Sequence, residues 1–76
     1  PNPAQNTANV AVSFEQAVDV EVEIVNVVGQ ILTSTREEGL TKGDFTFDLT
    51  SYPSGVYLVR IKANNESVTR RLVITK

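Results

Sequence analysis

Residues 48–61 read Asp-Leu-Thr-Ser-Tyr-Pro-Ser-Gly-Val-Tyr-Leu-Val-Arg-Ile, and this stretch organises the predicted fold. Its middle predicts a turn over residues 52–55, because proline presets φ at about −65° early in a turn and glycine accepts a positive φ later in it. A strand is therefore expected to begin at Val56. Both alternating faces are apolar from Val56 to Val59, which predicts a central strand that is covered on both sides.

Alternation of apolar and polar residues predicts five further strands around this one. The clearest alternation runs over residues 18–24, where four apolar side chains share one face and three acidic side chains share the other. The expected strands cover residues 10–14, 18–24, 30–36, 45–49, 56–61 and 68–76. The arms at 30–36 and 68–76 are expected at sheet edges, because the first is less apolar and the second mixes charged and apolar residues.

The connections follow from polar runs and turn-forming residues. Residues 15–17 and 37–43 show no period and are expected to be a short connection and a loop, while residues 26–29 and 64–65 predict two hairpin turns. Six or seven short strands without a helical period predict an all-β fold, a small antiparallel β-sandwich of immunoglobulin-like size. Residues 1–8 are expected to be a linker, and residues 9–76 the sandwich.

Length and composition limit the classes of function. A chain of 76 residues is long enough for one small domain, and it has no Cys, His, Met or Trp. Its net charge of −2 argues against nucleic-acid binding, and no apolar run approaches the roughly 20 residues of a membrane-spanning helix. The chain begins at Pro1 without an initiator Met or a signal peptide, so it is expected to be a piece of a longer protein.

Catalysis and cofactor binding are not expected. Without His and Cys the chain lacks the usual general base, thiol nucleophile and soft metal ligands. Asp19, Glu21 and Glu23 line one strand face and raise the alternative of a calcium site, but a flat strand supplies few ligands, so a solvated acidic face is the preferred interpretation. A glycosidase pair at Asp44 and Asp48 is disfavoured, because so short a chain leaves little room for a substrate cleft.

Positive charge gathers toward the end of the chain. Arg70, Arg71 and Lys76 lie in the last arm, after Arg60 and Lys62 in the arm before it. From composition alone, ordinary solubility charge on an edge strand is favoured over a recognition surface. This asymmetry is nevertheless the strongest candidate for a binding site.

Four pieces of the sequence occur in the order and spacing of a known family. They are Pro1-Asn2-Pro3, a turn containing Asn26, Gly29 and Gln30, the pair Asp48-Leu49 followed by Gly55 and Tyr57, and a basic, apolar last strand that ends at Lys76. With these pieces, nearly the whole chain resembles the C-terminal sorting domain of proteins that Gram-negative bacteria export through the type IX secretion system.

The resemblance implies a non-catalytic address tag fused behind a cargo enzyme or adhesin. The outer-membrane secretion machinery would recognise the tag after the cargo reaches the periplasm, and a sortase-like protease would then remove it. The cargo would be secreted or attached to surface lipopolysaccharide. By resemblance and charge, Arg70, Arg71 and Lys76 are the expected recognition residues, with strand addition as the hypothesised mode.

Other interpretations stay open at this point. An accessory carbohydrate-binding or adhesion module would need exposed aromatic side chains, and only Tyr52 among the five aromatic residues lacks an expected core position. A passive spacer would tolerate any change of surface charge. Open sheet edges also allow a weak homodimer.

Overall fold

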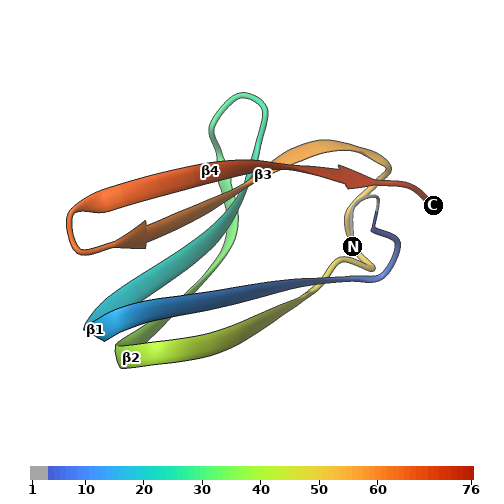
Figure 1. The fold of residues 1–76 in the computed structure, drawn as a ribbon. Helices are drawn as coiled ribbons and strands as arrows, with labels where there is room; N and C mark the ends of the chain where they lie inside the picture. The colour runs from blue at the N-terminus through green and yellow to red at the C-terminus, as the bar shows by residue number, and fades with distance from the viewer. Residues whose placement is uncertain (1–3) are drawn as a thin grey trace.

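The computed structural model describes residues 4–76, which form one four-stranded antiparallel sheet without a helix (Figure 1). Its strands are β1 (Thr7–Asn26), β2 (Ile31–Asp48), β3 (Gly55–Ala63) and β4 (Glu66–Ile74). Their order across the sheet is β2-β1-β3-β4, with β2 and β4 at the edges as predicted. The all-β class is therefore confirmed, whereas six to seven strands, a two-sheet sandwich and the immunoglobulin-like detail are not.

The smaller number of strands arises because two expected connections lie inside strands. Residues 15–17 belong to β1, and residues 37–43 belong to β2, so the predicted loop at 37–43 is wrong. The pairing of β1 with β2 shifts register between Ser13 and Val18. Such an irregularity bends a strand pair and increases its twist without ending it. The aperiodic polar residues thus mark a bend in one long hairpin.

This bend folds the sheet over its own inner face. The first half of β1 and the last half of β2 lie across from β3 and β4 (Figure 1). Apolar side chains from both halves meet in between and form the core, because burying apolar area is the main favourable term in folding. The buried core side chains are Ala4, Ala8, Val20, Val22, Ile24, Phe45, Phe47, Leu49, Tyr57, Val59, Leu72 and Ile74.

The interior strand β3 is covered on one face only. Tyr57 and Val59 are buried on the inner face, but Val56 is 41% exposed and Leu58 is half-buried on the outer face. The prediction of a strand covered on both sides is therefore wrong, because no second layer of the described chain covers the outer face. The interior position of β3, between β1 and β4, agrees with the prediction.

Both predicted hairpin turns are present. Asn26 Oδ1 accepts hydrogen bonds from the backbone N of Val28 (3.1 Å) and of Gln30 (2.9 Å), and Gly29 has a φ of 92°. Asn64 and Asn65 have φ values of 54° and 64°, in the left-handed region that asparagine tolerates better than most residues. These residues therefore fix where β1 reverses into β2 and where β3 reverses into β4.

The two ends of the described chain are tied together. The backbone N of Ala4 donates to Val73 O (2.8 Å), and the backbone N of Thr75 donates to Ala4 O (2.8 Å), which makes a short parallel bridge beside Ile74. Ala4 is 2% exposed. The division of the chain at residue 8 stays a prediction, and the Pro1-Asn2-Pro3 motif lies outside the described residues.

Candidate functional site

The two arginines of the candidate site lie on opposite faces of β4. Arg70 stands opposite Val59 of β3 and shares the inner face with Leu72, whereas Arg71 stands opposite Leu58 on the outer face. Both arginines are exposed. The Arg70 guanidinium donates to Thr69 O at 3.3 Å, and no carboxylate among residues 4–76 forms an ion pair with it. Arg70 is thus a permanent cation that the described part of the chain does not neutralise.

Lys76 has a different position from the arginines, because it is tied to the turn before β3. Its Nζ donates to Leu49 O (2.8 Å), and its backbone N donates to Ser54 Oγ (3.0 Å). Its ammonium group therefore stabilises the turn between β2 and β3. The structure does not gather the three predicted residues into one cluster.

The turn that Lys76 contacts is built by motif residues. Asp48 Oδ1 accepts hydrogen bonds from Thr50 N (3.0 Å) and Thr50 Oγ1 (2.7 Å). These bonds hold the pKa of Asp48 below its usual value, against a small rise from burial, and the charge of Lys76 lowers it further. Leu49 is fully buried directly after Asp48. The motif thus fixes local structure.

Tyr57 completes this turn from β3. Its hydroxyl donates to Pro53 O at 2.7 Å, and its ring stacks on that of Tyr52 with a centroid separation of 5.9 Å. A buried tyrosine normally finds such a partner for its hydroxyl. Gly55 begins β3 at the end of the same turn. Asp48, Leu49, Gly55 and Tyr57 therefore have structural roles.

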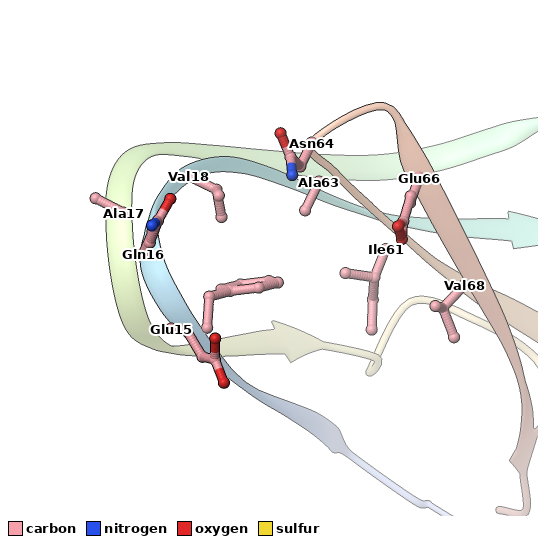
Figure 2. Close-up of a pocket in the computed structure, with 10 residues that line it drawn as sticks. Glu15, Gln16, Ala17, Val18, Ile61, Ala63, Asn64, Glu66 and Val68 are labelled. Atoms are coloured by element: carbon pink, nitrogen blue, oxygen red, sulfur yellow. The ribbon is translucent and has the colours of Figure 1, made fainter.

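A groove of about 410 Å³ opens where the bent hairpin and the β3–β4 turn diverge (Figure 2). The side chains of Val18, Ala63 and Ile61 point into the hollow, and polar residues of the bend and the β3–β4 turn lie around it. The lining residues are Phe14, Glu15, Gln16, Ala17, Val18, Ile61, Ala63, Asn64, Glu66 and Val68. The apolar interior is therefore incompletely covered at this end of the molecule.

A second groove, of about 450 Å³, continues from the first between β1 and β4. The two grooves share Ile61 and Val68. Residues 8–11 of β1 form one wall, and residues 70–72 of β4 line the other side. The sequence pattern does not predict this groove, because the groove exists only through the bend that brings the first half of β1 opposite β4.

The acidic stripe of β1 is paired with cations of the neighbouring strands. Glu23 is only 3% exposed, and its Oε1 accepts from Arg60 Nε (2.8 Å) and lies 3.5 Å from Lys62 Nζ. Lys62 also lies 3.6 Å from Glu21, and Arg36 lies 3.5 Å from Asp19. The prediction of a solvated acidic face is thus wrong for Glu23.

Electrostatics keep Glu23 charged in this position. Burial by itself would raise the pKa of Glu23, but the hydrogen bond and charge of Arg60, helped by Lys62, outweigh it, so the pKa lies below its usual value. Within residues 4–76, no three acidic side chains converge in a way that could hold a metal ion. Arg60 and Lys62 are thereby paired within the sheet, whereas Arg70 of β4 has no carboxylate partner on the described chain.

The carbohydrate-binding alternative gains no support from the aromatic side chains. Phe45, Phe47 and Tyr57 are buried, and Phe14 and Tyr52 are half-buried. A sugar platform of the kind that such modules use would need an exposed ring, and the described residues present none. None of the observations favours this alternative.

Comparison with known proteins identifies the family of the chain. A search of curated proteins found no counterpart of this chain. Within residues 4–76, no helix has the length and apolar character needed to cross a membrane. The family model described as secretion system C-terminal sorting domain matches residues 1–75. Since the match covers nearly the whole sequence, the chain belongs to the secretion system C-terminal sorting domain family and is a C-terminal sorting signal of the type IX secretion system.

Proposed function

We propose that the secretion machinery reads this sorting signal at β4, through Arg70 and Arg71, while Lys76 positions the strand end. The single observation that carries this proposal is the unneutralised cation of Arg70 on an edge strand. Guanidinium groups bind carboxylates through two parallel hydrogen bonds, so an acidic receptor surface suits them. The motif residues Asp48, Leu49 and Tyr57 are occupied in the turn and the core.

The family defines the setting in which the site works. A sorting domain of this family is in general non-catalytic, is fused to a cargo protein, interacts with the type IX machinery and leads to a secreted or cell-surface cargo. We propose in addition that the cargo passes through the periplasm before recognition. A sortase-like protease then removes the domain by cutting on its cargo side.

The bridge between the two ends of the described chain supports a recognition site and a cleavage site that lie close together. Ala4 bridges to Ile74 of β4, so the N-terminal end of the described chain lies beside the strand that carries the arginines. A receptor bound to β4 would therefore hold the junction with the cargo within reach of the protease. Self-association through the edges of β2 or β4 is the competing use of the same surfaces, and sedimentation of the chain at increasing concentration tests it.

The proposed function is tested by export of a fluorescent cargo fused to residues 1–76 in a type IX-competent host. The double variant Arg70→Ala/Arg71→Ala is expected to leave the cargo inside the cell at wild-type thermal stability. The matched control Arg36→Ala/Lys42→Ala removes two cations from β2 and is expected to be exported normally. Wild-type export of the Arg70→Ala/Arg71→Ala fusion would refute the proposed site.

Point variants are needed because truncation cannot separate recognition from folding. Deleting residues 70–76 would also remove Leu72 and Ile74 from the core. Loss of export in such a truncated chain would follow from unfolding alone. Cleavage is checked in the same experiment by the mass of the exported cargo, which is expected to lack the sorting domain.

A further inference from the structure

Exposed apolar side chains gather at the turn between β1 and β2, which projects past β3 and β4 (Figure 1). Among residues 4–76, the large hydrophobic residues that are exposed are Val27, Val28, Ile31, Leu32, Val56 and Val68. All except Val68 lie in or beside this turn, because the pairing of Asn26 with Tyr57 places the start of β3 next to it. We call Val27, Val28, Ile31 and Val56 the apolar tip.

Hydrogen bonds within the turn hold the apolar tip in one conformation. The side-chain amide of Asn26 accepts from the backbone N of Val28 and of Gln30, and its Nδ2 donates to Gln30 Oε1 (2.7 Å). The backbone N of Asn26 donates to Gln30 O (3.0 Å), and that of Gly29 donates to Asn26 O (3.0 Å). The polar motif residues are thus used inside the turn, whereas the side chains of Val27 and Val28 are left 69% and 77% exposed.

The sheet beside the tip carries a small apolar cluster on its outer face. Val25 stands between Ile31 of β2 and Leu58 of β3. It is only 2% exposed, although it does not belong to the core cluster of the inner face. Leu58 is half-buried. An apolar partner at the tip would therefore extend a cluster that the outer face already contains.

The turn and its flanks are uncharged. Residues 24–35 contain no acidic or basic side chain, although the chain has seven basic and nine acidic residues. Single exposed hydrophobic side chains are normal on protein surfaces, but a contiguous group of them marks an interaction site. Burying a charge without a partner costs free energy, so a surface without charges suits a pocket that is also apolar and uncharged.

A lipid surface and a second copy of the chain suit the tip less well. Segments that lie in a membrane interface carry aromatic and basic residues, and residues 24–35 contain neither. A stable dimer buries about 800 Å² on each partner, whereas the tip exposes on the order of 400 Å². The observations therefore favour a compact protein pocket.

We propose that the apolar tip inserts into an uncharged apolar pocket of a protein of the type IX machinery. Val27 and Val28 are neighbours at the end of a projecting turn, so one pocket can enclose both side chains. The hydrogen-bonded turn is already ordered, which lowers the entropy cost of binding. The inference goes beyond the proposed site on β4, because it uses other residues and depends on burial of apolar area instead of on charge.

The test measures binding of residues 1–76 to outer-membrane fragments of a type IX-competent host, sheared so that both sides are open. The chain has no Cys, so Thr41→Cys allows a single fluorescent label at an exposed position of β2, ten residues along the strand from Ile31. The label in the pellet is measured after sedimentation. We expect binding to these fragments, but neither to protein-free liposomes of their extracted lipids nor to fragments from a host without the machinery.

Two variants of the labelled chain make the test specific. Val27→Thr/Val28→Thr keeps the shape of both side chains and makes them polar, so it is expected to bind about tenfold more weakly. Its thermal stability is expected to stay near that of the unchanged chain, because both side chains are exposed. The matched control Val68→Thr changes an exposed valine away from the tip and is expected to bind normally. Val28→Thr alone repeats the measurement if the double variant unfolds.

The outcomes distinguish the tip from other occupants and from the proposed site. Equal binding of the unchanged chain and of Val27→Thr/Val28→Thr would overturn the proposal. Binding to the protein-free liposomes, or a dimer of the free chain that the threonines abolish, would refute a protein pocket. Binding that is lost in Arg70→Ala/Arg71→Ala and kept in the threonine variant would refute the tip and leave the proposed site standing. The reverse result would support the tip and refute the proposed site.

Discussion

Tyr57 shows at the scale of one residue how the family motif serves the fold. Its ring is buried against Tyr52, and its hydroxyl is satisfied by Pro53 O. We expect Tyr57→Ala to lower the free energy of unfolding by about 3–5 kcal/mol through lost burial, and Tyr57→Phe by about 1 kcal/mol through the lost hydrogen bond. Urea unfolding of the two variants measures this. Arg71→Ala is the control and should stay within about 0.5 kcal/mol of the unchanged chain.

The lowered pKa of Glu23 predicts how the free energy of unfolding depends on pH. Its pKa in the folded chain lies below the ordinary value of 4.5, so the folded state binds the proton less readily than the unfolded state does. The stability from its pairing with Arg60 is therefore fully present above about pH 4.5 and is lost as the pH falls through the lower folded pKa.

Unfolding measured between pH 6 and pH 2 checks this expectation. The free energy of unfolding of the Glu23→Gln variant should fall less on acidification than that of the unchanged chain. Asp48→Asn should lose a different part, because the pKa of Asp48 is also lowered, by its bonds with Thr50. A decline that is identical in the unchanged chain and in Glu23→Gln would show that the Glu23–Arg60 pair contributes nothing to acid sensitivity.

Sequence patterns predicted side-chain faces better than side-chain partners. The period of two correctly placed Val20, Val22 and Ile24 in the core. It could not reveal that Glu23 is buried on the other face, because that burial depends on Arg60 and Lys62 of β3, which are distant in sequence and adjacent across the sheet. Alternation along one strand contains no information about the strand beside it.

At the scale of elements, β4 is both a core strand and an exposed edge. Lys76 follows the end of β4, and its ammonium group donates a hydrogen bond to Leu49 O in the turn between β2 and β3. We expect Lys76→Met to lower the free energy of unfolding by about 1 kcal/mol, because a partly exposed charge-assisted bond is lost while the aliphatic stem remains. Chemical unfolding measures this, with Lys42→Met on β2 as the control. Equal stability of all three chains would show that Lys76 is free to act in recognition.

The long strands β1 and β2 show where element prediction failed. Residues 15–17 and 37–43 lack apolar periodicity, which is typical of loops, and yet they lie within strands. The strands continue through them because the flanking alternations on both sides align with β2, with register shifts between Ser13 and Val18 and between Val18 and Val20. The polar, aperiodic residues correctly indicated the position of the bend. Whether a strand continues through a bend depends on its partner strand, which the local sequence does not reveal.

At the scale of the whole molecule, one bent sheet encloses the core and leaves Arg70 and Arg71 of β4 exposed. The turn at residues 48–55 and the core hold the inner face together, and the bridge from Ala4 to Ile74 joins the two ends of the described chain beside β4. The candidate arginines and the family were accessible from sequence order and charge. The groove between β1 and β4 and the structural role of Lys76 were not, because both arise from contacts between residues that are distant in sequence.

The central claim is that export depends on the β4 arginines separately from fold stability. The most direct measurement is the exported fraction of the fluorescent fusion, plotted against the free energy of unfolding for Tyr57→Phe, Arg36→Ala/Lys42→Ala and Arg70→Ala/Arg71→Ala. We predict that Tyr57→Phe is less stable but exported, whereas Arg70→Ala/Arg71→Ala is stable but retained. An exported fraction that follows stability alone across all variants would contradict the account.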